Sequence, residues 1–178
     1  EAQMQAMFDD CANLALAEGA RDVFISDTEE RQSSIWDARG AFLEAIKNST
    51  TEMDECDVVV GIDQVAEFCQ FARDLSEQQQ IRIRSFGHAG DGNLHPSILC
   101  DRRDKEEFSC VERAVDDLFN AALELGGTLS GEHGIGTAKI KWLEQETSHG
   151  TIMFSRRLRK AFDPKGLFNP SKIVGFGD

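Results

Sequence analysis

The sequence predicts an α+β fold in which helices back one open, mainly antiparallel sheet. Short apolar, β-branched runs indicate buried strands, one segment alternates with period two, and longer segments space their apolar residues as helices do. Strand–helix–strand units stand beside a hairpin-like pair of strands, with further helices between them, which is the order of an α+β domain. The length of 178 residues fits one domain, or one domain with a small appendage.

The first third of the chain is expected to hold two helices and two strands. Asp27 is the expected N-cap of the longer helix, because Glu30 follows it at the spacing of a capping box. The run CDVVVGI is apolar and β-branched, which predicts a buried strand. In chain order we expect a helix that ends near Glu18 and Gly19, a strand at 22–26, a helix at 27–48 and a strand at 56–62.

The remainder is expected to form a hairpin followed mainly by helices. The segment IRIRSFG alternates as a half-exposed strand does, and Pro96 in NLHPSILC indicates an edge position or a bulge. Asp104, with Glu107 three residues on, is the expected N-cap of the clearest helix, which Gly126 and Gly127 would end. The expected elements are a helix at 63–79, strands at 81–87 and 93–100, a helix at 104–127, an extended piece entering a glycine-rich loop at 128–136, helices at 137–146 and 150–163, and an irregular tail.

Composition restricts the partners of this chain. The formal net charge of −13 argues against nucleic acid, and it requires a local arginine or a bound cation to attract an anionic substrate. No run approaches the roughly 18 apolar residues of a membrane span. The five cysteines are odd in number and lack CxxC spacing, which favours reduced thiols in a cytoplasmic type of compartment.

Two glycine-rich stretches hold three of the four histidines. They read GHAGDGNLH at 87–95 and SGEHGIG at 130–136. His88, His95 and Glu132 together suit a divalent transition metal such as Zn²⁺, Mn²⁺ or Fe²⁺, with coordination positions left open for a substrate. The residues alone leave a second interpretation open, in which these stretches are ordinary turns whose imidazoles cap a helix or face water.

Arg39 lies next to Trp36 on a predicted helix. It is either a surface arginine or a bidentate clamp for a substrate carboxylate, a geometry that the guanidinium fork favours. The sequence pattern does not choose between the two.

Three stretches carry a resemblance to a known family. SFGHAGDGNLHPSI, GGTLSGEHGIGTAK and FDPKGLFNPSKIV resemble the C-terminal cap domain of FAD-linked oxidases of the vanillyl-alcohol-oxidase type. The most similar branch holds the glycolate oxidase flavin subunit, D-lactate dehydrogenase and D-2-hydroxyglutarate dehydrogenase. The resemblance covers about residues 33–178. It implies a ferredoxin-like cap that is truncated at its N-terminus, with residues 1–160 as the cap and 161–178 returning to an FAD-binding domain that precedes the cap in this family.

The resemblance also implies roles for individual residues. The metal ligands would be His88, His95 and Glu132, the general base His133, the substrate-carboxylate ligand Arg39, and the cofactor-binding residues Asn169 and Lys172. Two positions depart from the hydroxyglutarate branch: Glu55-Cys56 stands where that branch has a substrate-binding lysine, and Ser97 stands where one branch has asparagine. These departures favour a smaller hydroxy acid such as lactate or glycolate.

The expected function is therefore that of a cap domain in an FAD-dependent 2-hydroxy-acid dehydrogenase. Hydride would pass from the substrate Cα to flavin N5 while His133 takes the hydroxyl proton, and the chain alone is expected to be inactive. Its expected partners are its own FAD-binding domain, an electron-transfer subunit through which it could associate with a membrane, and a second copy paired at a sheet edge. The alternatives are a stand-alone metal-binding or ligand-sensing module and, more weakly, a metallohydrolase, for which no nucleophile is evident.

Overall fold

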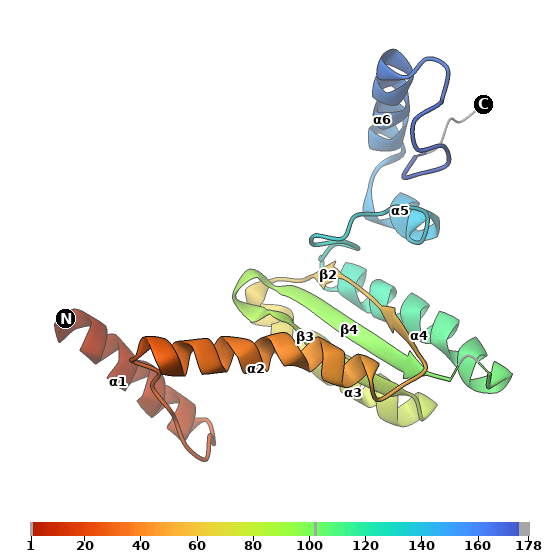
Figure 1. The fold of residues 1–178 in the computed structure, drawn as a ribbon. Coiled ribbons are helices and arrows are strands. Elements are labelled where there is room, and N and C mark those ends of the chain that lie inside the picture. Colours follow the sequence, from red (N-terminus) through yellow and green to blue (C-terminus); the bar gives the residue numbers. More distant parts are fainter. Residues whose placement is uncertain (1, 102, 175–178) are drawn as a thin grey trace. The chain divides into compact units, whose positions relative to one another are not determined.

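A computed structural model describes residues 2–101 and 103–174 of the chain (Figure 1). The chain divides into two compact units, Glu1–Asn48 and Ser49–Asp178. The first unit contains α1 (Ala2–Ala17) and α2 (Glu29–Lys47), and neither helix has a buried residue within it. The first helix ends where the sequence predicts.

The cap of α2 differs from the prediction by one residue. Thr28, not Asp27, is the N-cap, and its side chain accepts a hydrogen bond from the backbone N–H of Arg31. Asp27 instead pairs with the Arg31 guanidinium, with 3.0 Å between Oδ1 and Nη1. Arg31 therefore binds both residues, Thr28 through its backbone N–H and Asp27 through its guanidinium.

The strand predicted at 22–26 is wrong. These residues form no regular element, and Phe24 is 86% exposed. The described part of this unit contains no strand, so the backbone of this apolar run has no neighbouring strand with which to form sheet hydrogen bonds.

The second unit is built on an antiparallel sheet, which confirms the predicted α+β class. Four strands pair among the described residues, with β4 at the centre between β3 on one side and β1 and β2 on the other. The sheet is open and does not close into a barrel. The strands are β1 (Glu52–Glu55), β2 (Val58–Val59), β3 (Arg82–His88) and β4 (Asn93–Cys100).

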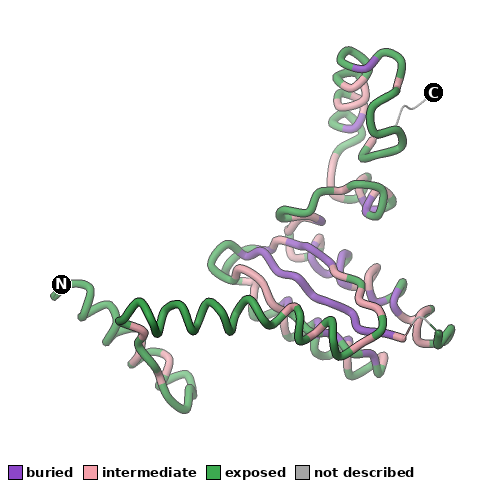
Figure 2. The backbone as a smooth tube through the Cα atoms, in the orientation of Figure 1, coloured by how far each residue is buried: buried purple, intermediate pink, exposed green. Residues whose placement is uncertain are grey.

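The edge or bulge position inferred from Pro96 is also wrong, because β4 is the central strand and is buried along its whole length (Figure 2). The neighbouring strand accommodates the proline. β1 and β2 keep one register against β4, with Glu55 opposite Ser97 and Val58 opposite Leu94, and they are interrupted only at 56–57. Cys56 donates its N–H to the Pro96 carbonyl at 2.9 Å, but proline has no N–H to return. The predicted strand at 56–62 is accordingly reduced to β2.

Two helices, α3 (Val65–Gln79) and α4 (Lys105–Glu124), lie along the sheet and bury its apolar face (Figure 1). Asp104 caps α4 as predicted and accepts from the N–H groups of Glu106 and Glu107. The central core residues are Val58, Phe68, Ala72, Leu94, Ile98, Val111, Ala114, Leu118 and Leu129. Because side chains alternate along a strand, His95 and Ser97 of β4 point to the opposite face. That face carries the polar groups.

The chain continues through two shorter helices. α5 (Ile140–Glu146) buries Trp142 against Phe119 of α4, with ring centroids 4.6 Å apart, and α6 (His149–Phe162) precedes an irregular tail. Two short 3₁₀ turns complete the unit, η1 (Ile62–Gln64) and η2 (Ala89–Asp91). No helix in the described residues is long and apolar enough to span a membrane.

Candidate metal centre

A hairpin carries the two candidate histidine ligands. His88 is the last residue of β3, η2 forms the turn, and His95 lies three residues into β4. Gly92 closes this turn with φ of 72°, and a Cβ there would collide with the carbonyl oxygen of Val60. The turn therefore requires glycine. It brings the two imidazole rings edge to face with centroids 5.6 Å apart.

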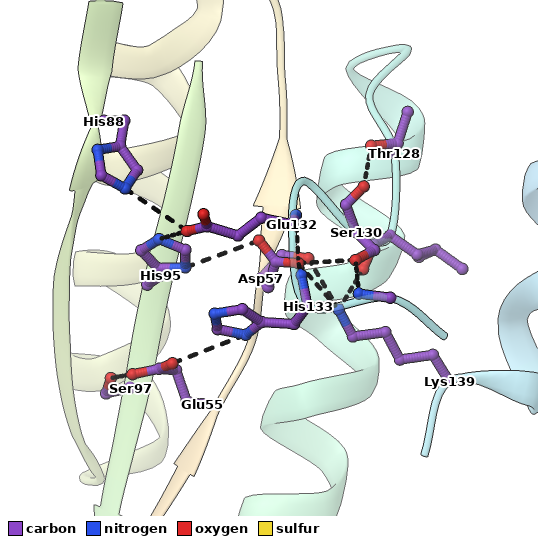
Figure 3. Close-up of polar contacts among 12 residues, drawn as sticks. Glu55, Asp57, His88, His95, Ser97, Thr128, Ser130, Glu132, His133 and Lys139 are labelled. Carbon is purple, nitrogen blue, oxygen red and sulfur yellow. Dashed lines mark hydrogen bonds and ion pairs between the residues drawn. The ribbon is translucent and has the colours of Figure 1, made fainter. Parts of the chain in front are cut away.

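Glu132 reaches both histidines from the second glycine-rich loop (Figure 3). Its Oε1 lies 3.0 Å from His95 Nε2 and 3.5 Å from His88 Nε2. One ligand atom from each of these three residues lies within 4.8 Å of the others, which is a separation that a single cation can bridge. The His95 side chain is 6% exposed, whereas those of His88 and Glu132 are 40% and 51% exposed. The group is anchored at His95 and open to solvent on the other side.

His133 lies directly beside this group. Its ring stacks on that of His95, with centroids 5.1 Å apart and planes inclined by 10°. Its Nδ1 lies 3.8 Å from Oε1 of Glu55, and the other oxygen of Glu55 lies 3.5 Å from the Ser97 hydroxyl. Glu55, His95 and His133 thus form a second cluster of ligand-type atoms that shares His95 with the first.

Asp57 organises the loop that carries Glu132 and His133. Its Oδ2 accepts hydrogen bonds from the Ser130 hydroxyl at 2.7 Å and from the backbone N–H groups of Glu132 and His133 at 3.0 and 2.8 Å. Ser130 Oγ in turn accepts from the N–H of Gly134 at 2.7 Å. Burial alone would raise the pKa of the Asp57 carboxyl, but these hydrogen bonds, assisted by the charge of Lys139, lower it to about 2. Asp57 therefore stays ionised.

Lys139 is the buried cation beside Asp57. Its Nζ donates to the carbonyl oxygens of Asp57 and Leu129 at 3.1 and 2.7 Å, and it lies 3.5 Å from Asp57 Oδ2. The two side chains are 8% and 0% exposed. The sequence interpretation missed both residues. An acidic residue inside the apolar run at 56–62 was the available signal, since a buried carboxylate requires partners.

The remaining candidates lie elsewhere in the chain. Arg39 is on α2 in the first unit, with its guanidinium carbon 5.5 Å from the centre of the Trp36 ring. Asn169 and Lys172 are exposed in the tail, where their carbonyl oxygens accept hydrogen bonds from the Arg159 guanidinium. Among the described hydrogen bonds and ion pairs, none joins Asn169 or Lys172 to His88, His95 or Glu132.

The chain is similar in sequence to known proteins along almost its whole length. The sequence model of the family described as FAD linked oxidases, C-terminal domain, matches residues 1–173. A D-lactate dehydrogenase of Anaerostipes hadrus is 37% identical over 174 residues, which is 97% of this chain and 37% of the relative. The glycolate oxidase subunit GlcD of Bacillus subtilis is 38% identical over 156 residues, which is 86% of this chain and 33% of the relative.

A D-lactate dehydrogenase of Archaeoglobus fulgidus is 32% identical over 166 residues, covering 93% of this chain and 36% of the relative. The chain thus spans about a third of the length of the curated relatives that it matches. The match extends over almost all of the chain, including both glycine-rich loops. This chain belongs to the family of FAD-linked oxidase C-terminal domains.

Proposed function

We propose that this chain is the metal- and substrate-binding part of an FAD-dependent 2-hydroxy-acid dehydrogenase acting on D-lactate or glycolate. The observation that carries the proposal is the convergence of Glu132 on His88 and His95, in a chain of this family. Relatives named D-lactate dehydrogenase and glycolate oxidase subunit GlcD favour this function over that of a stand-alone metal-binding or ligand-sensing module.

The donor set fits a divalent transition metal. Two imidazole nitrogens and one carboxylate oxygen are ligands that Zn²⁺, Mn²⁺ and Fe²⁺ accept, and three protein ligands leave positions open for a substrate. When bound, such a cation attracts an anionic hydroxy acid and makes its hydroxyl more acidic. This local positive charge offsets the repulsion between an anionic substrate and a chain of net charge −13.

His133 is the proposed general base. Its Nδ1 faces Glu55 at 3.8 Å, so we assign proton acceptance to the other ring nitrogen, Nε2. The hydroxyl proton of the substrate passes to Nε2, the Cα–H bond breaks with both its electrons, and the product is a 2-oxo acid. FAD would supply the acceptor for that hydride.

Glu55 favours a substrate with one carboxylate. Its side chain is 24% exposed and lies beside His133, where a second carboxylate on a longer substrate would meet its negative charge. Ser97, 3.5 Å from Glu55, adds no positive charge. Both residues support a small hydroxy acid over a dicarboxylic one.

Arg39 is the proposed ligand of the substrate carboxylate, since its fork is suited to bidentate binding. Asn169 and Lys172 are the proposed contacts to the flavin. The Arg159 guanidinium holds the backbone around them, and both residues are exposed. On this proposal residues 1–160 act as the cap, and 161–178 form the segment that returns to an FAD-binding domain.

We further propose that the enzyme is cytoplasmic, that an electron-transfer subunit accepts its electrons, and that two copies pair through the sheet. The FAD-binding domain supplies most of the contacts to FAD, so the 178-residue chain alone is expected neither to retain FAD nor to oxidise lactate.

The test is flavin reduction in the full-length protein. Mixing it anaerobically with D-lactate or glycolate should bleach the flavin absorbance, and His133→Asn should slow that reduction by about 10²–10⁴-fold. Asp91→Asn, in the other glycine-rich loop, is the control and should reduce at the wild-type rate. Reduction of His133→Asn at the wild-type rate would remove His133 as the base, and no bleaching by either acid would refute the proposed activity.

A further inference from the structure

Two buried polar atoms at the site face each other without a close hydrogen-bond partner. They are Oδ1 of Asp57 and Nδ1 of His95, which are 3.7 Å apart. The register of β1 and β2 against β4 sets the two residues opposite each other, between the pairs Glu55–Ser97 and Val58–Leu94. Leaving a buried donor or acceptor unpaired is unfavourable, so this juxtaposition needs an explanation.

We propose that Asp57 is the positioning residue of the metal centre, orienting His95 through Nδ1 while it holds the backbone of Glu132. The inference rests on the metal site proposed above and assigns it a residue outside the ligand set. Asp57 does not touch the cation in this arrangement. It acts through two of the ligands, His95 and Glu132, whose Nε2 and Oε1 atoms lie 3.0 Å apart.

The chemistry of the two side chains determines which nitrogen of His95 carries the proton. An ionised carboxylate can only accept hydrogen bonds, and a neutral imidazole has one donor and one acceptor nitrogen. With Oδ1 of Asp57 facing Nδ1, the proton belongs on Nδ1 and the lone pair on Nε2. That lone pair faces Glu132 Oε1 at 3.0 Å. Both atoms are then acceptors and cannot hydrogen-bond to each other, but one cation can bind to both.

The second oxygen of Asp57 acts on the other ligand. Oδ2 accepts from the backbone N–H groups of Glu132 and His133 and from the Ser130 hydroxyl. One fully buried carboxylate therefore connects the central strand, which carries His95, to the loop that carries Glu132 (Figure 3). Lys139, 3.5 Å from Oδ2, balances the buried charge.

A second aspartate shows what a merely structural carboxylate looks like in this chain. Asp163 is 7% exposed and accepts from the backbone N–H groups of Leu167 and Phe168 at 3.0 and 2.8 Å. It caps its loop as Asp57 does and has Arg159 as a charged neighbour, but no described contact joins it to a histidine. The contact to His95 and the ion pair with Lys139 separate Asp57 from Asp163.

Zinc affinity of the 178-residue chain tests the proposal, measured by competition with a chromophoric chelator. Asp57→Asn leaves a single carbonyl oxygen, which can accept from the loop or from His95 but not from both, so this variant should bind zinc about 10–100-fold more weakly. The matched control Asp163→Asn should bind within about twofold of wild type. Equal weakening in both variants, or unchanged affinity in Asp57→Asn, would overturn the proposal.

A second measurement needs no variant, which matters if Asp57→Asn does not fold. Nitrogen-15 NMR of the histidine rings in the zinc-loaded wild-type chain should show His95 protonated at Nδ1 and unprotonated at Nε2. A proton on Nε2 would overturn the proposal. Wild-type protein that binds no zinc refutes the metal site itself, whereas normal zinc binding with the other tautomer refutes only the role of Asp57.

Discussion

Asp57 and Lys139 form a buried ion pair beneath the second glycine-rich loop, with Nζ 3.5 Å from Oδ2. The pair joins three separate segments, because Lys139 also donates to the carbonyl oxygens of Asp57 and Leu129. The sheet, the loop and the start of α5 are therefore connected through one ammonium group. Removal of either charge leaves the other buried without compensation.

Lys139→Met should lower the free energy of unfolding by about 3 kcal/mol, because it leaves the Asp57 carboxylate and two carbonyl oxygens without their cation. Urea denaturation followed by circular dichroism measures this loss. Lys141→Met is the matched control, since Lys141 pairs with Asp116 on the surface, where an ion pair contributes at most about 1 kcal/mol. Similar losses in the two variants would contradict the assigned role of Lys139.

The stabilisation that Asp57 provides should depend on pH. Its folded-state pKa of about 2 lies below the ordinary value of 3.8, so its contribution is fully present above about pH 4 and is lost as the pH falls towards 2. The difference in unfolding free energy between wild type and Asp57→Asn should therefore shrink over that range. Urea midpoints measured from about pH 6 to about pH 2.5 test this, and a difference that does not change with pH would exclude the lowered pKa.

Gly92→Ala should destabilise the hairpin that carries His88 and His95. The residue has φ of 72°, and the added Cβ would collide with the carbonyl oxygen of Val60. We expect a loss of about 1–3 kcal/mol, together with weaker zinc binding. Gly90→Ala, in the same turn, meets no atom within 4 Å and should change neither quantity measurably. Equal effects of the two substitutions would show that the turn does not require glycine at position 92.

Glu55→Gln should broaden substrate choice in the full-length protein. Removing this negative charge beside His133 should raise kcat/KM for a dicarboxylic 2-hydroxy acid about fivefold relative to D-lactate, which corresponds to about 1 kcal/mol. Steady-state kinetics with both acids gives the ratio. Glu67→Gln, an exposed substitution on α3, should leave the ratio as in wild type. An unchanged ratio of the two kcat/KM values in Glu55→Gln would show that Glu55 does not select the substrate.

Local patterns predicted the elements whose signals lie within a few residues. The alternation of β3, the apolar stripe of α4 and its Asp104 cap depend on short-range spacing, and the structure confirms them. The effect of Pro96 could not be read in the same way. It acts on the neighbouring strand, at 56–57, so it becomes visible only when the pairing of β4 is known.

The candidate site shows the same limit. The glycine-rich stretches and the family resemblance indicated His88, His95 and Glu132, and the structure brings these three together. Asp57 stayed hidden because it interrupts an apolar run that otherwise reads as a plain buried strand. Its partners lie far along the chain, since the loop that it holds begins at Ser130.

The metal content of the purified chain tests the central claim most directly. Inductively coupled plasma mass spectrometry of wild type, equilibrated with zinc and passed through a desalting column, should find about one zinc ion per chain. Glu132→Ala and His88→Ala should each lose most of it, because each removes one of three ligands. His149→Ala, which removes a histidine at the start of α6, should retain it. Equal zinc content in wild type, Glu132→Ala and His88→Ala would contradict the account.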